Sequence, residues 1–225
     1  MGRGPLDRKR TLHYKVQMEA NWAADHLQVI RTLMERSALY RRALAPIMLA
    51  CGVIGIAAAT AACFVKLNGP AMFAGFWLGV GVVASLISFL LVRRQALKDA
   101  EPVWSPPTRR VCQALLPPFL IGLTGAVIFL TFKDLTPDAG WFLAVLWVCV
   151  YGCALNAAGF FMQRGIRLFG WGFVVGGCIA FLAGELRPSL QTAEAAHYLM
   201  GIFFGVLHLA YGVYLYFTEK SRNAA

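Results

Sequence analysis

Six long uncharged apolar stretches divide this chain, and its basic residues gather in every second connection between them. Of the 21 lysines and arginines, 18 lie in the arm before the first stretch, in the loops after the second and fourth stretches, and in the tail. Connections rich in Lys and Arg stay on the cytoplasmic side of a membrane. The pattern therefore predicts a polytopic membrane protein with both termini in the cytoplasm. The six stretches cover residues 43–65, 72–92, 114–132, 141–161, 168–184 and 198–217.

The lengths of these stretches predict an all-α membrane protein. About 20 apolar residues cross the hydrocarbon core as a helix, and each stretch is close to that length. The connections on the side with few basic residues are short, so consecutive spans should pair as three antiparallel hairpins in a six-helix bundle. We divide the chain into a basic arm (1–42), a membrane domain (43–217) and a tail (218–225).

The N-terminal arm is expected to form an amphipathic helix along the cytoplasmic surface of the membrane. Asp25 and Gln28 are spaced as a helix N-cap and its reciprocal partner. Apolar residues then recur at helical spacing at Leu27, Ile30 and Met34, opposite basic residues. The arm is too polar for a signal peptide, so the first span should be an uncleaved anchor. The Ala, Gly and Arg usage is typical of a bacterial protein, which points to the inner membrane.

Paired arginines flank the spans and are predicted to anchor the cytoplasmic face. A Lys or Arg near an anionic leaflet contributes on the order of 1 kcal/mol of binding free energy, so contacts with anionic lipid are expected. Topology accounts for the net charge of +10, which therefore gives no reason to expect nucleic acid as a partner. These basic anchors are Arg41, Arg42, Arg93, Arg94, Arg109 and Arg110.

Glycines at helical spacing are the predicted means of helix packing. Lipid is as apolar as the helices, so spans associate through small residues that allow close approach. Three spans carry the Gly-x-x-x-Gly spacing, and the last one continues it, which indicates a compact bundle or a homodimer. The residues are Gly75, Gly79, Gly172, Gly176, Gly201, Gly205 and Gly212.

His208 is the deepest histidine in any span, and it shares a helical face with the glycines of the last stretch. By helical rise it lies about 15 Å from the external end of its span. Asn156, Cys153, Thr124 and Ser85 fall at comparable depth. We therefore predict a polar cluster at mid-membrane. Two roles remain open for His208: a neutral structural link between helices, or part of a proton or substrate pathway.

Other chemistry has weaker support in the sequence. The six cysteines lie in spans or on the cytoplasmic loop and read as small apolar residues. Cys149 and Cys153 share a helical face but lack further metal ligands at a convincing spacing. No cofactor is predicted, although haem ligation by His208 is a minor alternative. No Asp or Glu lies within any of the six stretches, whereas coupled transporters rely on buried carboxylates or broken helices.

These observations favour a non-enzymatic scaffold, regulatory or assembly subunit that binds a protein partner or anionic lipid at its cytoplasmic face. The runner-up is a small-solute permease or channel-like protein that uses the polar cluster around His208. A haem-binding or redox membrane subunit is the third hypothesis.

Overall fold

The computed structural model describes residue 22 and residues 43–100, 102–132, 136, 138–162 and 164–223. The helices discussed below belong to one compact unit, Leu39–Ala225. The expected amphipathic helix around Asp25, and the anchors Arg41 and Arg42, lie outside the described residues.

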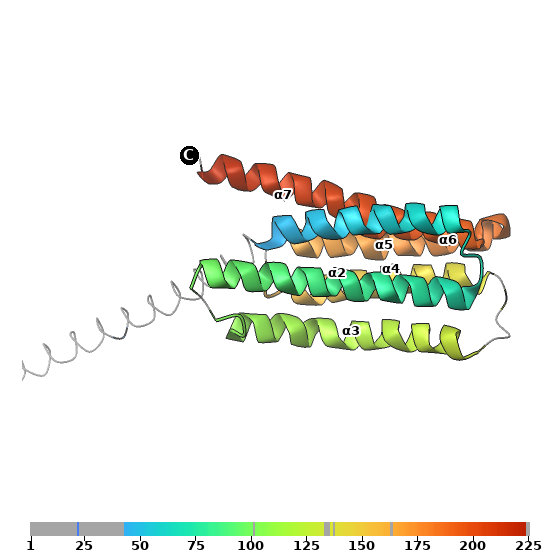
Figure 1. The fold of residues 1–225 in the computed structure, drawn as a ribbon, viewed down its shortest axis with the longest axis horizontal. Coiled ribbons are helices and arrows are strands. Elements are labelled where there is room, and N and C mark those ends of the chain that lie inside the picture. Colours follow the sequence, from blue (N-terminus) through green and yellow to red (C-terminus); the bar gives the residue numbers. More distant parts are fainter. Residues whose placement is uncertain are drawn as a thin grey trace, which may run out of the picture. The chain divides into compact units, whose positions relative to one another are not determined.

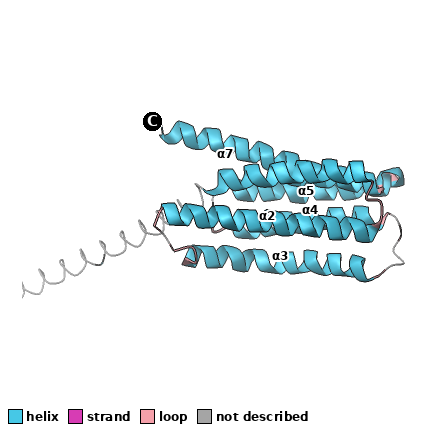
Figure 2. Cartoon of the chain, in the orientation of Figure 1, coloured by secondary structure: helices cyan, strands magenta, loops and turns pink. Residues whose placement is uncertain are grey.

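The described residues contain six helices that are long and apolar enough to cross a membrane, and no strand (Figure 2). The predicted all-α class and the number of spans are therefore confirmed for this part of the chain. Successive helices run antiparallel, side by side (Figure 1). The first span is Ala43–Val65, followed by α2 (Pro70–Lys98), α3 (Pro106–Thr131), α4 (Ala139–Ala158), α5 (Arg164–Leu186), a 3₁₀ turn (Pro188–Leu190), and a sixth span made of α6 (Ala193–Met200), a π-helical segment (Gly201–Leu207) and α7 (His208–Asn223).

Several helices extend beyond the apolar stretches that predicted them. The sequence placed residues 93–113 in a loop, but α2 continues to Lys98 and α3 already begins at Pro106. That part of the prediction is wrong, because hydropathy reports where the hydrocarbon ends rather than where the backbone stops being helical. Asp99 caps α2, and Pro106 occupies the first turn of α3, a position that proline favours.

The sixth span is interrupted by a segment that the sequence did not reveal. Thr192 caps its start, with its hydroxyl oxygen accepting from the Ala195 amide at 3.1 Å. Residues Gly201–Leu207 are π-helical, a rare geometry with wider turns that is often found at functional sites. The two glycines within this segment both lie against the first span.

The centre of the bundle is α4, and α2 and α3 lie at its margin. Half of the most apolar window of α4 is buried inside the protein, compared with 6% for α2 and 11% for α3. The buried core contains large side chains such as Phe73, Leu143 and Phe173. The two marginal helices present long apolar faces that suit contact with lipid acyl chains.

The first and sixth spans approach closely through glycines on both helices. Gly201, Gly205 and Gly212 meet Ala59, Ile56 and Leu49 of the first span, so residue numbers rise on one helix as they fall on the other. A methyl group added at Gly205 would lie 2.8 Å from the backbone nitrogen of Ile56, closer than real side chains pack. The backbones can approach this closely only because these positions have no side chain.

A second close interface joins α4 and α5. Here glycines recur every seven residues at Gly170, Gly177 and Gly184 on α5. Positions 170 and 177 lie against Gly152 and Cys149 of α4, which confirms antiparallel packing. A seven-residue repeat keeps one helix face on its partner over several turns, which explains why this pair is packed along its whole length.

We predict that Gly205→Ala destabilises the bundle, whereas Gly79→Ala does not. The added methyl at position 205 meets backbone, which cannot move aside cheaply, so we expect a loss of about 1–3 kcal/mol in unfolding free energy. Nothing lies within 4 Å of a methyl added at Gly79. Equilibrium unfolding of the full chain in mixed micelles measures both variants, and equal effects would contradict the proposed interface.

Candidate functional site

His208 is buried between three helices, and both of its ring nitrogens have hydrogen-bond partners. Its side chain is 2% exposed. Nδ1 lies 2.9 Å from the carbonyl oxygen of Phe203, and Nε2 lies 2.9 Å from the hydroxyl of Tyr151 on α4. A carbonyl can only accept, so Nδ1 carries the proton and donates. In the neutral ring Nε2 is then the acceptor and the Tyr151 hydroxyl donates to it.

Aromatic rings enclose the His208 imidazole. Phe169 and Phe173 of α5 present their edges or faces to it at centroid distances of 5.2 and 5.5 Å. Phe204 lies parallel to it at 5.9 Å. Apolar surroundings make a charged ring costly, which favours the neutral imidazole. Phe203, whose carbonyl accepts the Nδ1 proton, belongs to the π-helical segment, so this link ties the irregular part of the sixth span to α4.

His197 forms a second link of the same kind near the start of the sixth span, in α6. It is also 2% exposed. Nδ1 accepts from the indole N–H of Trp77 on α2 at 2.9 Å, and Nε2 lies 3.0 Å from the carbonyl oxygen of Leu67. Because an indole can only donate and a carbonyl can only accept, His197 is neutral with its proton on Nε2. The two histidines therefore carry opposite tautomers.

The pair of imidazole links is suited to holding helices rather than to reacting. Each ring nitrogen already has a partner, so neither histidine offers a free nitrogen to a metal, a haem iron or a substrate without first losing a bond. Phe73 packs on His197 at a centroid distance of 5.0 Å, as the aromatic rings do around His208. Both links join the sixth span to a different helix, α2 at His197 and α4 at His208.

The other members of the expected polar cluster lie elsewhere. Asn156 donates to the backbone oxygen of Arg167 at 3.5 Å, where α4 ends and α5 begins. The Thr124 hydroxyl donates to the Leu120 carbonyl of its own helix at 2.8 Å on an exposed face. Cys153 and Ser85 are also exposed. The described residues thus bring Tyr151, not these four, to His208.

The remaining predicted glycines differ in what they contact. Gly176 lies against the ring of Phe203 from the sixth span, and a methyl added at Gly75 would be in ordinary contact with Leu130 of α3 at 3.6 Å. Positions 79 and 172 face open space, with nothing within 4 Å of an added methyl. The spacing motif alone therefore did not distinguish glycines at helix contacts from glycines on the outer surface.

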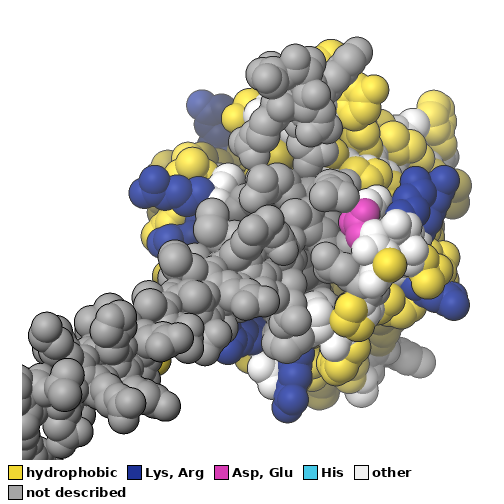
Figure 3. Space-filling view, turned by 90° about the vertical axis from the view of Figure 1, so that its left-hand side faces the viewer, with side chains coloured by type: hydrophobic (Ala, Val, Ile, Leu, Met, Phe, Trp, Pro, Cys, Tyr) yellow, Lys and Arg dark blue, Asp and Glu magenta, His cyan; other side chains and the backbone are white. Residues whose placement is uncertain are grey.

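Described cations gather at the end of the bundle where α2 ends and α3 and α5 begin, and we refer to this as the basic end. Figure 3 looks onto it and shows Lys and Arg side chains around its rim. Lys66 and Arg187 lie at the opposite end. The basic end carries Arg93, Arg94, Lys98, Arg109, Arg110, Arg164 and Arg167.

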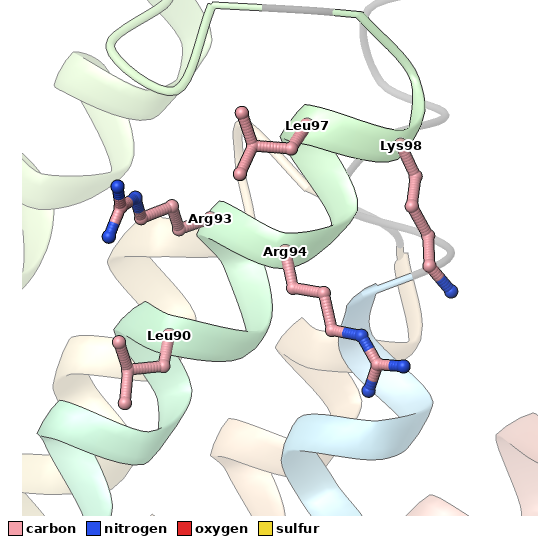
Figure 4. A pocket seen from close by; sticks show the side chains of 5 residues that line it. All are labelled: Leu90, Arg93, Arg94, Leu97 and Lys98. Carbon is pink, nitrogen blue, oxygen red and sulfur yellow. The ribbon is translucent and has the colours of Figure 1, made fainter.

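A pocket of about 490 Å³ lies at the basic end, on the last two turns of α2. Its described lining consists of Leu90, Arg93, Arg94, Leu97 and Lys98 (Figure 4). Arg93 extends to one side of the helix, and Arg94 and Lys98 extend to the other. Polar and apolar groups therefore alternate around one exposed helical face.

Sequence reasoning missed the hydrogen-bond donors that complete both histidine links. Nothing in the sequence marks Tyr151 or Trp77 among the aromatic residues, which make up 13% of the chain. His197 was visible on the same helical face as His208, which was a usable signal for a second link. The glycine repeat at 170, 177 and 184 was also readable, because its period of seven is regular.

Known proteins give no guide to this site, since no protein-family model, curated protein or solved structure matches the chain. The six cysteines are free. Among the described residues, no three His, Cys, Asp or Glu side chains are grouped as a metal site would require. What the site does must therefore be argued from its own geometry.

We predict that Tyr151→Phe lowers the unfolding free energy by about 1–2 kcal/mol, because it leaves Nε2 of His208 buried without a donor. Tyr214→Phe is the matched control: it removes the same hydroxyl from a residue that is 62% exposed on α7 and should be close to neutral. Unfolding in mixed micelles compares the two, and a Tyr151 variant as stable as the control would refute the structural role of the link.

Proposed function

We propose that this chain is a non-enzymatic membrane subunit, a scaffold, regulator or assembly factor, that binds a protein partner at its basic end. In this proposal the six spans hold the molecule in the cytoplasmic membrane with both termini inside. The chain is a polytopic membrane protein by the length and hydropathy of its described helices. Binding of a protein partner at the basic end is what we propose in addition.

This proposal is based on the hydrogen bonds by which the buried polar side chains connect helices. His208 and His197 each use both ring nitrogens to connect helices. The glycine contacts between the first and sixth spans and between α4 and α5 bring backbone against backbone. Helices connected in this way form a rigid bundle. We therefore place the proposed function at the exposed surface.

The basic end is the part of that surface with the most distinctive chemistry. Exposed arginines on α2 and α3, at positions 93, 94, 109 and 110, face the side to which the basic N-terminal arm also belongs by sequence. Clustered cations favour partners that carry negative charge and speed their association. A partner with an acidic surface therefore suits this end.

The permease hypothesis has less support. It needs a polar path around His208, yet Asn156 bonds to the start of α5 and Thr124, Cys153 and Ser85 lie on exposed faces. The haem hypothesis needs an available imidazole nitrogen, and His208 has none that is not already bonded. Neither alternative is favoured by a specific contact.

We expect deletion of residues 1–40 to reduce recovery of the partner at least tenfold while the six spans still insert. The reason is that the arm carries seven of the chain's 21 Lys and Arg residues before Arg41. The measurement is quantitative mass spectrometry of proteins that co-purify, in mild detergent, with tagged full-length and shortened chains.

The matched control is Lys66→Gln combined with Arg187→Gln, which removes charge from the opposite end of the bundle and should leave recovery unchanged. Membrane fractionation establishes that both variants are inserted. Equal partner recovery from the full-length and shortened chains, or no stoichiometric protein partner with either, would overturn the proposal.

A further inference from the structure

The pocket at the end of α2 combines charge and apolar surface in the order found in a phospholipid. Its lining residues, 90, 93, 94, 97 and 98, include pairs that are three and four apart, and they lie along one broad side of the helix with Arg93 at one edge and Arg94 and Lys98 at the other. Arg93, Arg94 and Lys98 are exposed. Because these three side chains are exposed, a ligand at the surface of the helix can reach their charges.

The height of these residues matches a membrane boundary. With Pro70 at the opposite edge of the hydrocarbon, Leu90 lies about 30 Å along the 29-residue helix, which is the thickness of the core. Arg93 and Arg94 lie about 35 Å along it, within the headgroup layer, and the backbone of Lys98 lies about 42 Å along it, roughly 5 Å beyond that layer. The Lys98 side chain extends back toward the level of Arg94 (Figure 4). Arg93 and Arg94 therefore stand at the level of lipid phosphates, and Leu90 stands at the level where acyl chains begin.

An exposed apolar stripe continues from the pocket toward the membrane interior. Val83, Leu86 and Leu90 follow one another at helical spacing on the same face, and each is about half exposed. Gly79 lies on this face one turn further, with nothing within 4 Å of its Cβ position. From Leu90 to Gly79 the helix rises about 16 Å, roughly one leaflet of hydrocarbon. This length suits one acyl chain lying along the stripe.

We propose that the pocket formed by Leu90, Arg93, Arg94, Leu97 and Lys98 is a binding site for one anionic phospholipid. The phosphate lies beside Arg94 and Lys98, whose charged ends extend to the same side of the helix in Figure 4, while Arg93 extends to the other side and adds positive charge to the same end of α2. An acyl chain follows the stripe from Leu90 to Gly79. The three positive charges favour an anionic over a zwitterionic headgroup. Leu90 and Leu97 favour a lipid over a free phosphate, because only a lipid has an apolar part to contact them.

This inference rests on the proposed function, because it assigns a ligand to the same basic end. The two can fail separately. Lipid binding is measured on the purified chain alone, whereas the proposed function requires a second protein. A lipid at this site would hold the last turns of α2 at the membrane surface and so fix the basic end against which a partner docks.

The test uses native mass spectrometry of the full chain in detergent micelles with equal amounts of phosphatidylglycerol and phosphatidylcholine. We expect one phosphatidylglycerol to be retained in preference to phosphatidylcholine. Arg93→Gln combined with Arg94→Gln should weaken this binding about 20- to 30-fold, from roughly fivefold for each cation. Arg93→Lys combined with Arg94→Lys keeps the charge and should bind within about threefold of the unmodified chain.

The matched control is Arg109→Gln combined with Arg110→Gln, which removes two exposed charges from the same end of the bundle but from α3. It should weaken the retention of phosphatidylglycerol far less than the α2 Gln pair does. Equal losses from the α2 and α3 pairs would overturn the site, since that result describes a general attraction of the basic end. Equal retention of both lipids would overturn it too. Displacement by inorganic phosphate, beyond that caused by chloride of the same ionic strength, would make it a phosphate site rather than a lipid site.

Thermal unfolding of the variants provides the folding check. All four substituted arginines are exposed, so the Gln pairs should unfold at the temperature of the unmodified chain. If the α2 Gln pair unfolds early, the Lys pair and a single Lys98→Gln variant decide the outcome. Lys98→Gln should weaken phosphatidylglycerol binding about fivefold, and unchanged binding in that variant would contradict the site.

Discussion

A polar side chain inside a membrane must find its hydrogen-bond partner within the protein, and this constraint organises the bundle. Water is absent from the hydrocarbon, so an unpaired imidazole or indole there costs free energy. His208 and His197 meet the requirement by bonding to Tyr151 and Trp77 on neighbouring helices. Each bond contributes only about 1 kcal/mol, but it also specifies which helix faces which. Glycine contacts then allow the backbones to close around these links.

The same constraint restricts where function can reside. In the function proposed here, the interior polar groups join helices and the specific chemistry lies at the surface. There the lipid-facing helices α2 and α3 expose apolar faces, and their ends at positions 93–98 and 109–110 carry cations. The lipid site proposed on α2 and the partner site proposed at the basic end both follow from this division between a closed interior and a charged rim.

Hydropathy and charge predicted the number of long apolar helices that the described part of the chain contains. They did not locate the C-terminal end of α2 or the start of α3, because a helix leaving the membrane keeps its backbone hydrogen bonds until a cap or proline intervenes. The glycine face of the sixth span was readable from spacing, and Gly201, Gly205 and Gly212 lie against the first span.

The partners of His208 could not be predicted from the sequence. The depth of a residue along its helix does not specify how that helix is rotated about its own axis, and this rotation decides that Tyr151 rather than Asn156 faces the imidazole. The π-helical turn at Gly201–Leu207 left no sequence signal either.

The most direct test of this account is the tautomeric state of the two buried histidines, measured by ¹⁵N NMR of the labelled full chain in nanodiscs. The chain has four histidines, so single His→Asn variants assign the signals. The hydrogen bonds predict two neutral rings in opposite tautomers, with the proton on Nδ1 of His208 and on Nε2 of His197. A charged imidazolium at either position, or the same tautomer at both, would contradict the claim that these side chains hold the bundle together through the contacts described.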